Sequence, residues 1–183
     1  MELKINTKQI LKFLYILSWI IFVGVSIDAG GILFNTFYSL LKPVVAQHFW
    51  PGIDLSSLYN YDIGHFIVVV TYMSISAVMK AIMFYLIIKI LHDKKLDMSQ
   101  PFSREVGSFI FNLSYLSFGI GIFSLWGIKY TEWLVKQGVN MPDLHYMNLS
   151  GADVWLFMSV TLFVIAQIFK RGKEIQDEHE LTV

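Results

Sequence analysis

Residues 13–34 read FLYILSWIIFVGVSIDAGGILF, an apolar run in which Asp28 is the single charged residue. A helix rises about 1.5 Å per residue, so it needs about 20 mostly apolar residues to cross the hydrocarbon of a bilayer. The run is therefore long enough for one membrane span. Lipid offers the backbone no hydrogen-bond partner, so the span must be helical. No A-x-A-like cleavage site follows it, and we expect it to be retained.

Three further apolar runs have the length of a span. They cover about residues 63–91, 106–128 and 149–169. Apolar residues make up 55% of the chain and charged residues 15%, whereas a soluble domain carries about 25% charged residues. The sequence therefore predicts an all-α fold: one membrane domain over residues 1–183, built as a four-helix transmembrane bundle.

Lysine and arginine are distributed unevenly among the connections. Ten of the fourteen lie in the N-terminal arm, the second connection and the tail: Lys4, Lys8, Lys12, Lys89, Lys94, Lys95, Arg104, Lys170, Arg171 and Lys173. The first and third connections hold Lys42, Lys129 and Lys136. Because positive residues concentrate on the cytoplasmic side, we expect both termini and the tail over residues 170–183 in the cytoplasm.

The first outer connection, residues 35–62, has helical spacing in its first half. The apolar positions are Phe34, Phe37, Tyr38, Leu41, Val45 and Phe49. This pattern predicts an interfacial amphipathic helix on the outer leaflet. Pro51-Gly52 would end it. At the start of the third span, Ser103 is a candidate N-cap.

Asp28 and Lys80 are the charged residues that lie deep within the predicted spans. At 1.5 Å per residue they lie about 22 Å and about 16 Å from the inner ends of their helices. We hypothesise that they pair across the first two helices. Such charges can form an ion or proton relay or a polar ligand site. They can equally form a packing pair that fixes helix register.

Other polar residues carry weaker signals. Asn112 and Gln167 lie in the third and fourth spans, where interhelical hydrogen bonds are the simplest role. Ser117 and Gly121 form a small-xxx-small pair that favours close helix packing. His48, His65 and His145 lie on the outer side with several aspartates, but their spacing matches no metal-ligand pattern. We therefore expect no metal site and no cofactor.

The composition also limits the classes of function. The chain has no cysteine and no catalytic or phosphate-binding motif, so we expect a protein that is not an enzyme. Its net charge is zero, which gives no basis for direct nucleic-acid binding.

The tail turns from basic to acidic after Lys173. It can be a stop-transfer flank followed by a solvated helix end. It can also be an extension of the fourth helix that binds a cytoplasmic partner through Ile175, Glu178 and Leu181.

Two segments resemble a known family. They are FVIAQIF at residues 163–169, followed by Arg171-Gly172, Glu174 and ELTV at 180–183, and QPFS at 100–103. Together they resemble the Domain of Unknown Function 2975 family of small bacterial four-span membrane proteins. The chain departs from it in a longer aromatic first outer loop and in few basic residues after Arg104.

The resemblance implies a location in the bacterial cytoplasmic (inner) membrane. The family has no assigned activity, but its genes commonly lie beside small helix-turn-helix regulators, which implies a cytoplasmic regulatory partner. We therefore expect a membrane regulator or sensor whose partners are the lipid bilayer, a helix-turn-helix regulator and a second copy of the chain. The alternative is a small oligomeric transporter or channel that uses Asp28 and Lys80.

Overall fold

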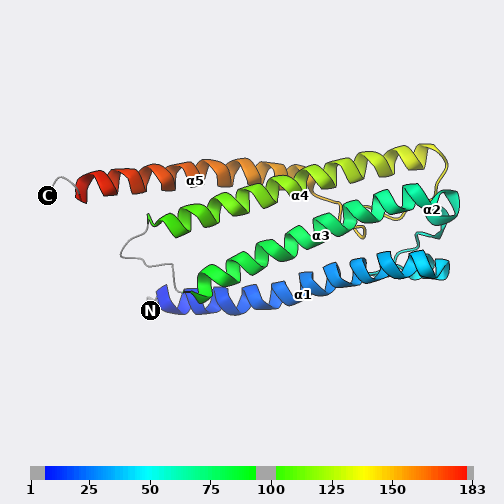
Figure 1. Ribbon diagram of the computed structural model, residues 1–183, viewed down its shortest axis with the longest axis horizontal. Coiled ribbons are helices and arrows are strands. Elements are labelled where there is room, and N and C mark those ends of the chain that lie inside the picture. Colours follow the sequence, from blue (N-terminus) through cyan, green and yellow to red (C-terminus); the bar gives the residue numbers. More distant parts are fainter. Residues whose placement is uncertain (1–6, 94–101, 181–183) are drawn as a thin grey trace, which may run out of the picture.

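The computed structural model describes residues 7–93 and 102–180 of the chain. Its four long helices are α1 (Thr7–Leu41), α3 (Ile63–His92), α4 (Arg104–Lys136) and α5 (Ala152–Glu180). Each is long and apolar enough to cross a membrane. Figure 1 shows that α1 begins and α5 ends at the same end of the molecule. The predicted all-α four-helix bundle is confirmed, and the chain is a multi-pass membrane protein.

The four helices lie in a row rather than around a common axis (Figure 1). Helix α1 packs against α3, α3 against α4, and α4 against α5. Within the described residues, α1 packs against neither α4 nor α5. Close α4–α5 packing uses Gly121, where a side chain would meet the backbone nitrogen of Leu156 at 3.1 Å. The predicted small-residue contact at Gly121 therefore lies within one chain.

Helix α1 corrects the prediction for the first outer connection. No separate amphipathic helix follows residue 34, because α1 continues unbroken to Leu41. The polar side chains after Phe34 do not interrupt it, since Asn35 and Thr36 donate hydrogen bonds to carbonyls four residues earlier. Pro43 ends the helix because its ring excludes a helical hydrogen bond and clashes with the preceding turn.

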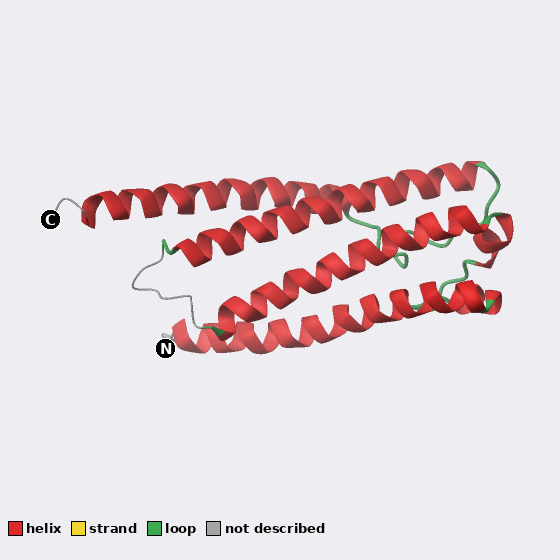
Figure 2. Ribbon diagram, viewed as in Figure 1, coloured by secondary structure: helices red, strands yellow, loops and turns green. Residues whose placement is uncertain are grey.

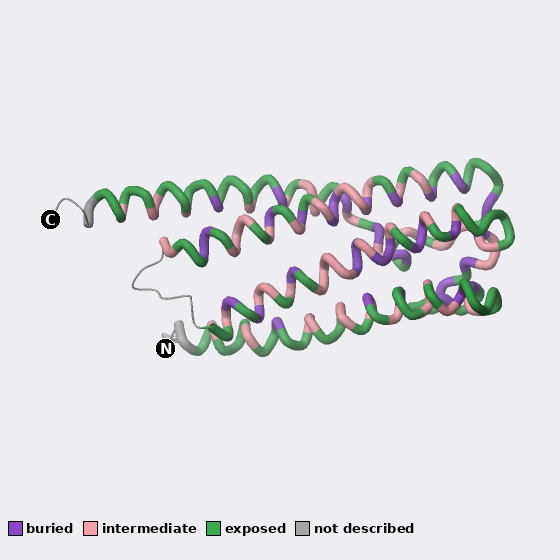
Figure 3. Tube along the Cα trace, in the orientation of Figure 1, coloured by how far each residue is buried: buried purple, intermediate pink, exposed green. Residues whose placement is uncertain are grey.

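A compact cap closes the end of the bundle that the sequence predicts to face outward. It consists of the 3-10 helix η1 (Pro43–His48), a tight turn in which Phe49 pairs with Ile53, and the short helix α2 (Ser56–Tyr61). Its fully buried side chains include Phe49, Leu55, Leu58 and, from α3, Phe66. Figure 3 shows that buried residues are concentrated at this end of the bundle. Exposed residues dominate α1 and α5, the two helices at the edges of the row.

The connection between α4 and α5 re-enters the bundle. Figure 2 shows this loop turning back from the end of α4 and running alongside the helices before α5 begins. Leu149 packs where Gly127 of α4 lacks a side chain, since a Cβ there would lie 2.9 Å from the leucine methyls. Gly127 lies nine residues before the end of α4 at Lys136, or about 14 Å at 1.5 Å per residue. Residues 139–151 therefore form a re-entrant segment, whose Val139, Met147 and Leu149 are buried.

The start of α4 carries the cap that the sequence predicts. Ser103 Oγ accepts a hydrogen bond from the Val106 backbone at the start of α4. Before α2, Asp54 accepts a hydrogen bond of 2.8 Å from the Ser56 amide. Hydrogen bonds from the Ser56 side chain and then its backbone lower the pKa of Asp54, because both favour the ionised carboxylate.

Candidate functional site

Lys80 and Asn148 form the centre of a polar cluster inside the bundle. The Lys80 ammonium donates to the Asn148 backbone carbonyl at 3.1 Å and to the Asn148 side-chain oxygen at 3.3 Å. Ser76, one turn away on α3, donates to the same carbonyl at 3.3 Å. The Trp155 ring of α5 lies 5.9 Å from the ammonium, within the range of a cation–π contact. Helices α3 and α5 and the re-entrant segment therefore meet at one lysine.

The backbone at Asn148 explains why its carbonyl is available. Asn148 has a φ of 60° and Gly151 a φ of 77°, both in the left-handed region. Asparagine tolerates this region better than most residues, so the chain can turn there and enter α5. Non-helical backbone within a membrane must find hydrogen-bond partners inside the protein. Lys80 and Ser76 supply them.

Asp28 has a different partner, the indole of Trp50. Trp50 Nε1 donates to the Asp28 carboxylate at 3.1 Å. Gly31 lies one turn further along α1, and a Cβ there would come within 2.5 Å of the Trp50 ring. The absence of a side chain at Gly31 therefore lets the indole rest on α1 and reach Asp28.

The predicted Asp28–Lys80 ion pair is wrong. Both residues are described, and the structure contains no ion pair between them, because each is engaged by a group from a connection. Their similar depth was predicted correctly. The Phe22 ring lies 6.4 Å from that of Tyr85, and Tyr15 stacks on His92, across the antiparallel α1 and α3, which places Asp28 level with residue 79. The Asp28 charge still attracts the Lys80 ammonium through space.

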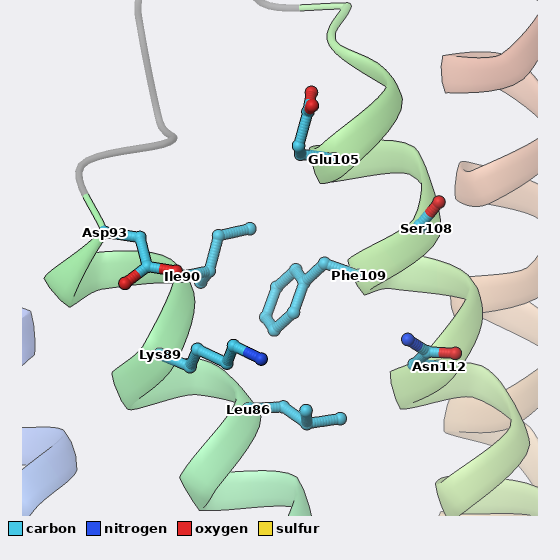
Figure 4. Close-up of a pocket in the computed structure, with 8 residues that line it drawn as sticks. All are labelled: Leu86, Lys89, Ile90, Asp93, Glu105, Ser108, Phe109 and Asn112. Atoms are coloured by element: carbon cyan, nitrogen blue, oxygen red, sulfur yellow. The ribbon is translucent and has the colours of Figure 1, made fainter.

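Asn112 and Gln167 lie on exposed helix surfaces. Neither makes a hydrogen bond to another described residue, so the interhelical bonds expected of them are not formed in this chain. Ser114 and Ser159 make that kind of contact instead, with Ser114 Oγ donating to the Ser159 carbonyl at 2.9 Å. Asn112 lines a cleft between α3 and α4 (Figure 4).

The tail continues α5 as a helix through Glu180, as the sequence indicated. Gly172 packs against Phe102, so this part of α5 still touches the start of α4. Arg171 forms an ion pair with Glu174, about one helical turn away on the surface. Ile175 has 44% of its surface exposed, and Glu178 is exposed too. Leu181 lies outside the described residues.

His48, His65 and His145, predicted on the outer side, do not gather into a metal site among the described residues. His65 hydrogen-bonds to the Tyr130 hydroxyl and lies 5.4 Å from the Trp133 ring. Within residues 7–93 and 102–180, no group of three His, Cys, Asp or Glu gathers as metal ligands would.

Comparison with known families gives one match. The model of a family described as "Protein of unknown function (DUF2975)" matches residues 39–183. The chain belongs to this family. The resemblance seen in residues 100–103 and 163–183 is thereby confirmed, and the match includes the re-entrant segment and Lys80. No curated protein and no solved structure matches the chain.

Sequence reasoning missed Asn148 and Trp50, the partners of the two charged residues within the spans. Asn148 precedes Leu149-Ser150-Gly151, and an asparagine and a glycine three apart can mark left-handed backbone. That signal could have located the turn, but not its depth. Trp50 stands beside Pro51-Gly52 and resembles any interfacial aromatic residue.

Proposed function

We propose that the protein is a non-enzymatic membrane regulator that acts on a cytoplasmic partner through α5. One observation carries the proposal: a single unbroken helix joins the polar cluster at Trp155 to the exposed surface around Ile175. A rigid helix transmits a shift at one end to the other. A change at Lys80 or in the outer cap would therefore move the tail.

The orientation supports an output in the cytoplasm. Helix α1 begins and α5 ends at one end of the bundle (Figure 1). Most lysines and arginines of the sequence lie in the segments that are predicted at this end. By the positive-inside rule this end faces the cytoplasm of the bacterial inner membrane. The chain has no cysteine, so a single introduced cysteine reports sidedness without background. In intact cells, a membrane-impermeant maleimide should label Gln137→Cys and leave Lys173→Cys unlabelled.

A cytoplasmic helix-turn-helix regulator is the proposed partner. Opposite charges spaced along the tail, with Ile175 between them, give a surface on which a second helix can pack. The protein itself carries no net positive charge to bind nucleic acid. A regulator held at the tail would therefore supply any contact with DNA.

Site-specific photocrosslinking tests the partner. A photoreactive residue at Ile175 should form an adduct with a soluble protein that contains a helix-turn-helix domain. The matched control is Ile168, two helical turns deeper on a similar face and 58% exposed, where lipid should be the neighbour. Equal protein adducts at both positions, or none at Ile175, would count against the proposal.

A small oligomeric transporter is the second candidate. It is favoured by the meeting of a lysine, non-helical backbone and the first turn of α5 inside the bundle, since transporters bind substrates at such breaks. Four spans are few for a pore, so this function requires a homo-oligomer. Substrate or ion flux in proteoliposomes that is lost in Lys80→Met would favour it over the regulator.

A further inference from the structure

We propose that the cleft between α3 and α4 at the end opposite the outer cap binds one phospholipid whose headgroup carries both a phosphate and a primary ammonium, as in phosphatidylethanolamine. The cleft has a volume of about 280 Å³ and is lined by Leu86, Lys89, Ile90, Asp93, Glu105, Ser108, Phe109 and Asn112. This inference does not depend on the proposed regulatory function.

The cleft lies where the last turns of α3 and the first turns of α4 face each other. Figure 4 shows Lys89 and Asn112 pointing toward one another across the gap, with Phe109 projecting from α4 toward Ile90. Because the helices form a row, neither α1 nor α5 packs against both walls of the cleft within the described chain. Lipid can therefore reach it from the membrane.

Polar groups of the lining follow one another along the helix axis in the same order as the chemical groups of a phospholipid. Glu105 and Asp93 lie at the mouth, in the first turn of α4 and just after α3. Lys89 lies one turn further in than Asp93. Asn112 lies seven residues beyond Glu105, about 10 Å deeper. Leu86, Ile90 and Phe109 form the apolar wall.

Charge complementarity selects the headgroup. An ammonium at the mouth would donate to the Glu105 carboxylate, and the Lys89 ammonium would donate to the phosphate. The deeper Asn112 amide would donate to an ester carbonyl of the glycerol. Glu105 and Lys89 together match the two charges of a zwitterionic headgroup, whereas a purely anionic lipid would leave Glu105 without an ammonium.

Four polar side chains of the cleft have no partner among the described residues. Lys89, Glu105, Ser108 and Asn112 make no hydrogen bond or ion pair with any residue in 7–93 or 102–180. A polar group at the edge of hydrocarbon is unfavourable without a partner. A zwitterionic headgroup satisfies both the donors and the acceptors.

Native mass spectrometry of the full chain with defined lipids tests the assignment. Phosphatidylethanolamine, phosphatidylcholine and phosphatidylglycerol with identical acyl chains are compared. Phosphatidylcholine has the same charges but no N–H to donate, so the wild type should bind the ethanolamine lipid about fivefold more tightly, the upper effect of one exposed charged pair. Binding should fall along the series of one, two and three N-methyl groups, a measurement that needs no variant.

Two variants locate the site. Glu105→Gln should abolish the preference for ethanolamine over choline, whereas Glu132→Gln, an exposed acid at the other end of α4, should keep it. Lys89→Gln should weaken every phospholipid about fivefold, while Lys129→Gln should not. Equal wild-type binding of the ethanolamine and choline lipids would overturn the proposal. So would a preference that survives Glu105→Gln, or a cleft closed by a second copy of the chain with no bound lipid.

Discussion

Replacing Lys80 by methionine tests whether the polar cluster holds the re-entrant segment in place. Methionine keeps an unbranched stem of nearly the same length and removes the ammonium, which donates to two oxygens of Asn148 at 3.1 and 3.3 Å. Hydrogen bonds to charged groups contribute about 1.5–3 kcal/mol each in soluble proteins, and interhelical bonds in membranes average about 0.6 kcal/mol. Ser76 still donates to the carbonyl. We therefore expect the loss of both Lys80 bonds to lower the free energy of unfolding by about 2 kcal/mol.

The free energy of unfolding can be measured in mixed micelles by titration with a denaturing detergent. Lys129→Met makes the same chemical change at an exposed position and should alter it by less than about 0.5 kcal/mol. A second variant, Asn148→Gly, keeps the left-handed backbone and removes the side chain that carries the accepting oxygen. The cycle between Lys80→Met and Asn148→Gly should give a coupling of about 0.6 kcal/mol. If Lys80→Met were no more destabilising than Lys129→Met, the lysine would not secure the segment.

Three further perturbations follow from contacts described above. Gly31→Ala should destabilise the protein by about 1–3 kcal/mol in the same titration, because the methyl would overlap the Trp50 ring. Gly30→Ala, where nothing lies within 4 Å, should be neutral or stabilising. Ser117→Ala should raise stability by about 1 kcal/mol, since the Ser117 hydroxyl is buried without a hydrogen-bond partner among the described residues. Asp54→Asn should destabilise the cap near neutral pH and not in acid, seen as a difference in thermal midpoint from the wild type. The folded pKa of Asp54 is lowered, so its contribution is present above the unfolded pKa and is lost as the pH falls through the folded one.

Hydropathy predicted the membrane-spanning helices because lipid leaves the backbone no alternative to a helix. The second span, expected over 63–91, is α3 from Ile63 to His92. Polar residues were a poorer guide to the positions at which the helices end. Asn35 and Thr36 suggested an exit from the membrane, but their side chains bond to the helix itself and α1 continues.

The site was predicted in part. Periodicity and rise per residue gave the matching depth of Asp28 and Lys80, because helix length is nearly invariant. Their partners were not predictable in the same way. The lysine binds a backbone carbonyl, which every residue possesses and which no residue type signals. The aspartate binds Trp50 only because Gly31 leaves room for the ring.

The row of helices has a consequence for assembly during synthesis. Each long helix packs against the long helix that precedes it in the chain, so each newly inserted span finds its docking surface already present in the membrane. The contact between Lys80 and Asn148 breaks this order, since 68 positions separate the two residues. Until the re-entrant segment is in place, the Lys80 ammonium lies in the bilayer without its acceptor. The nascent chain is therefore most open to quality-control proteases before residues 139–151 are in place, and a truncation that removes residues 139–180 should be degraded rather than accumulate.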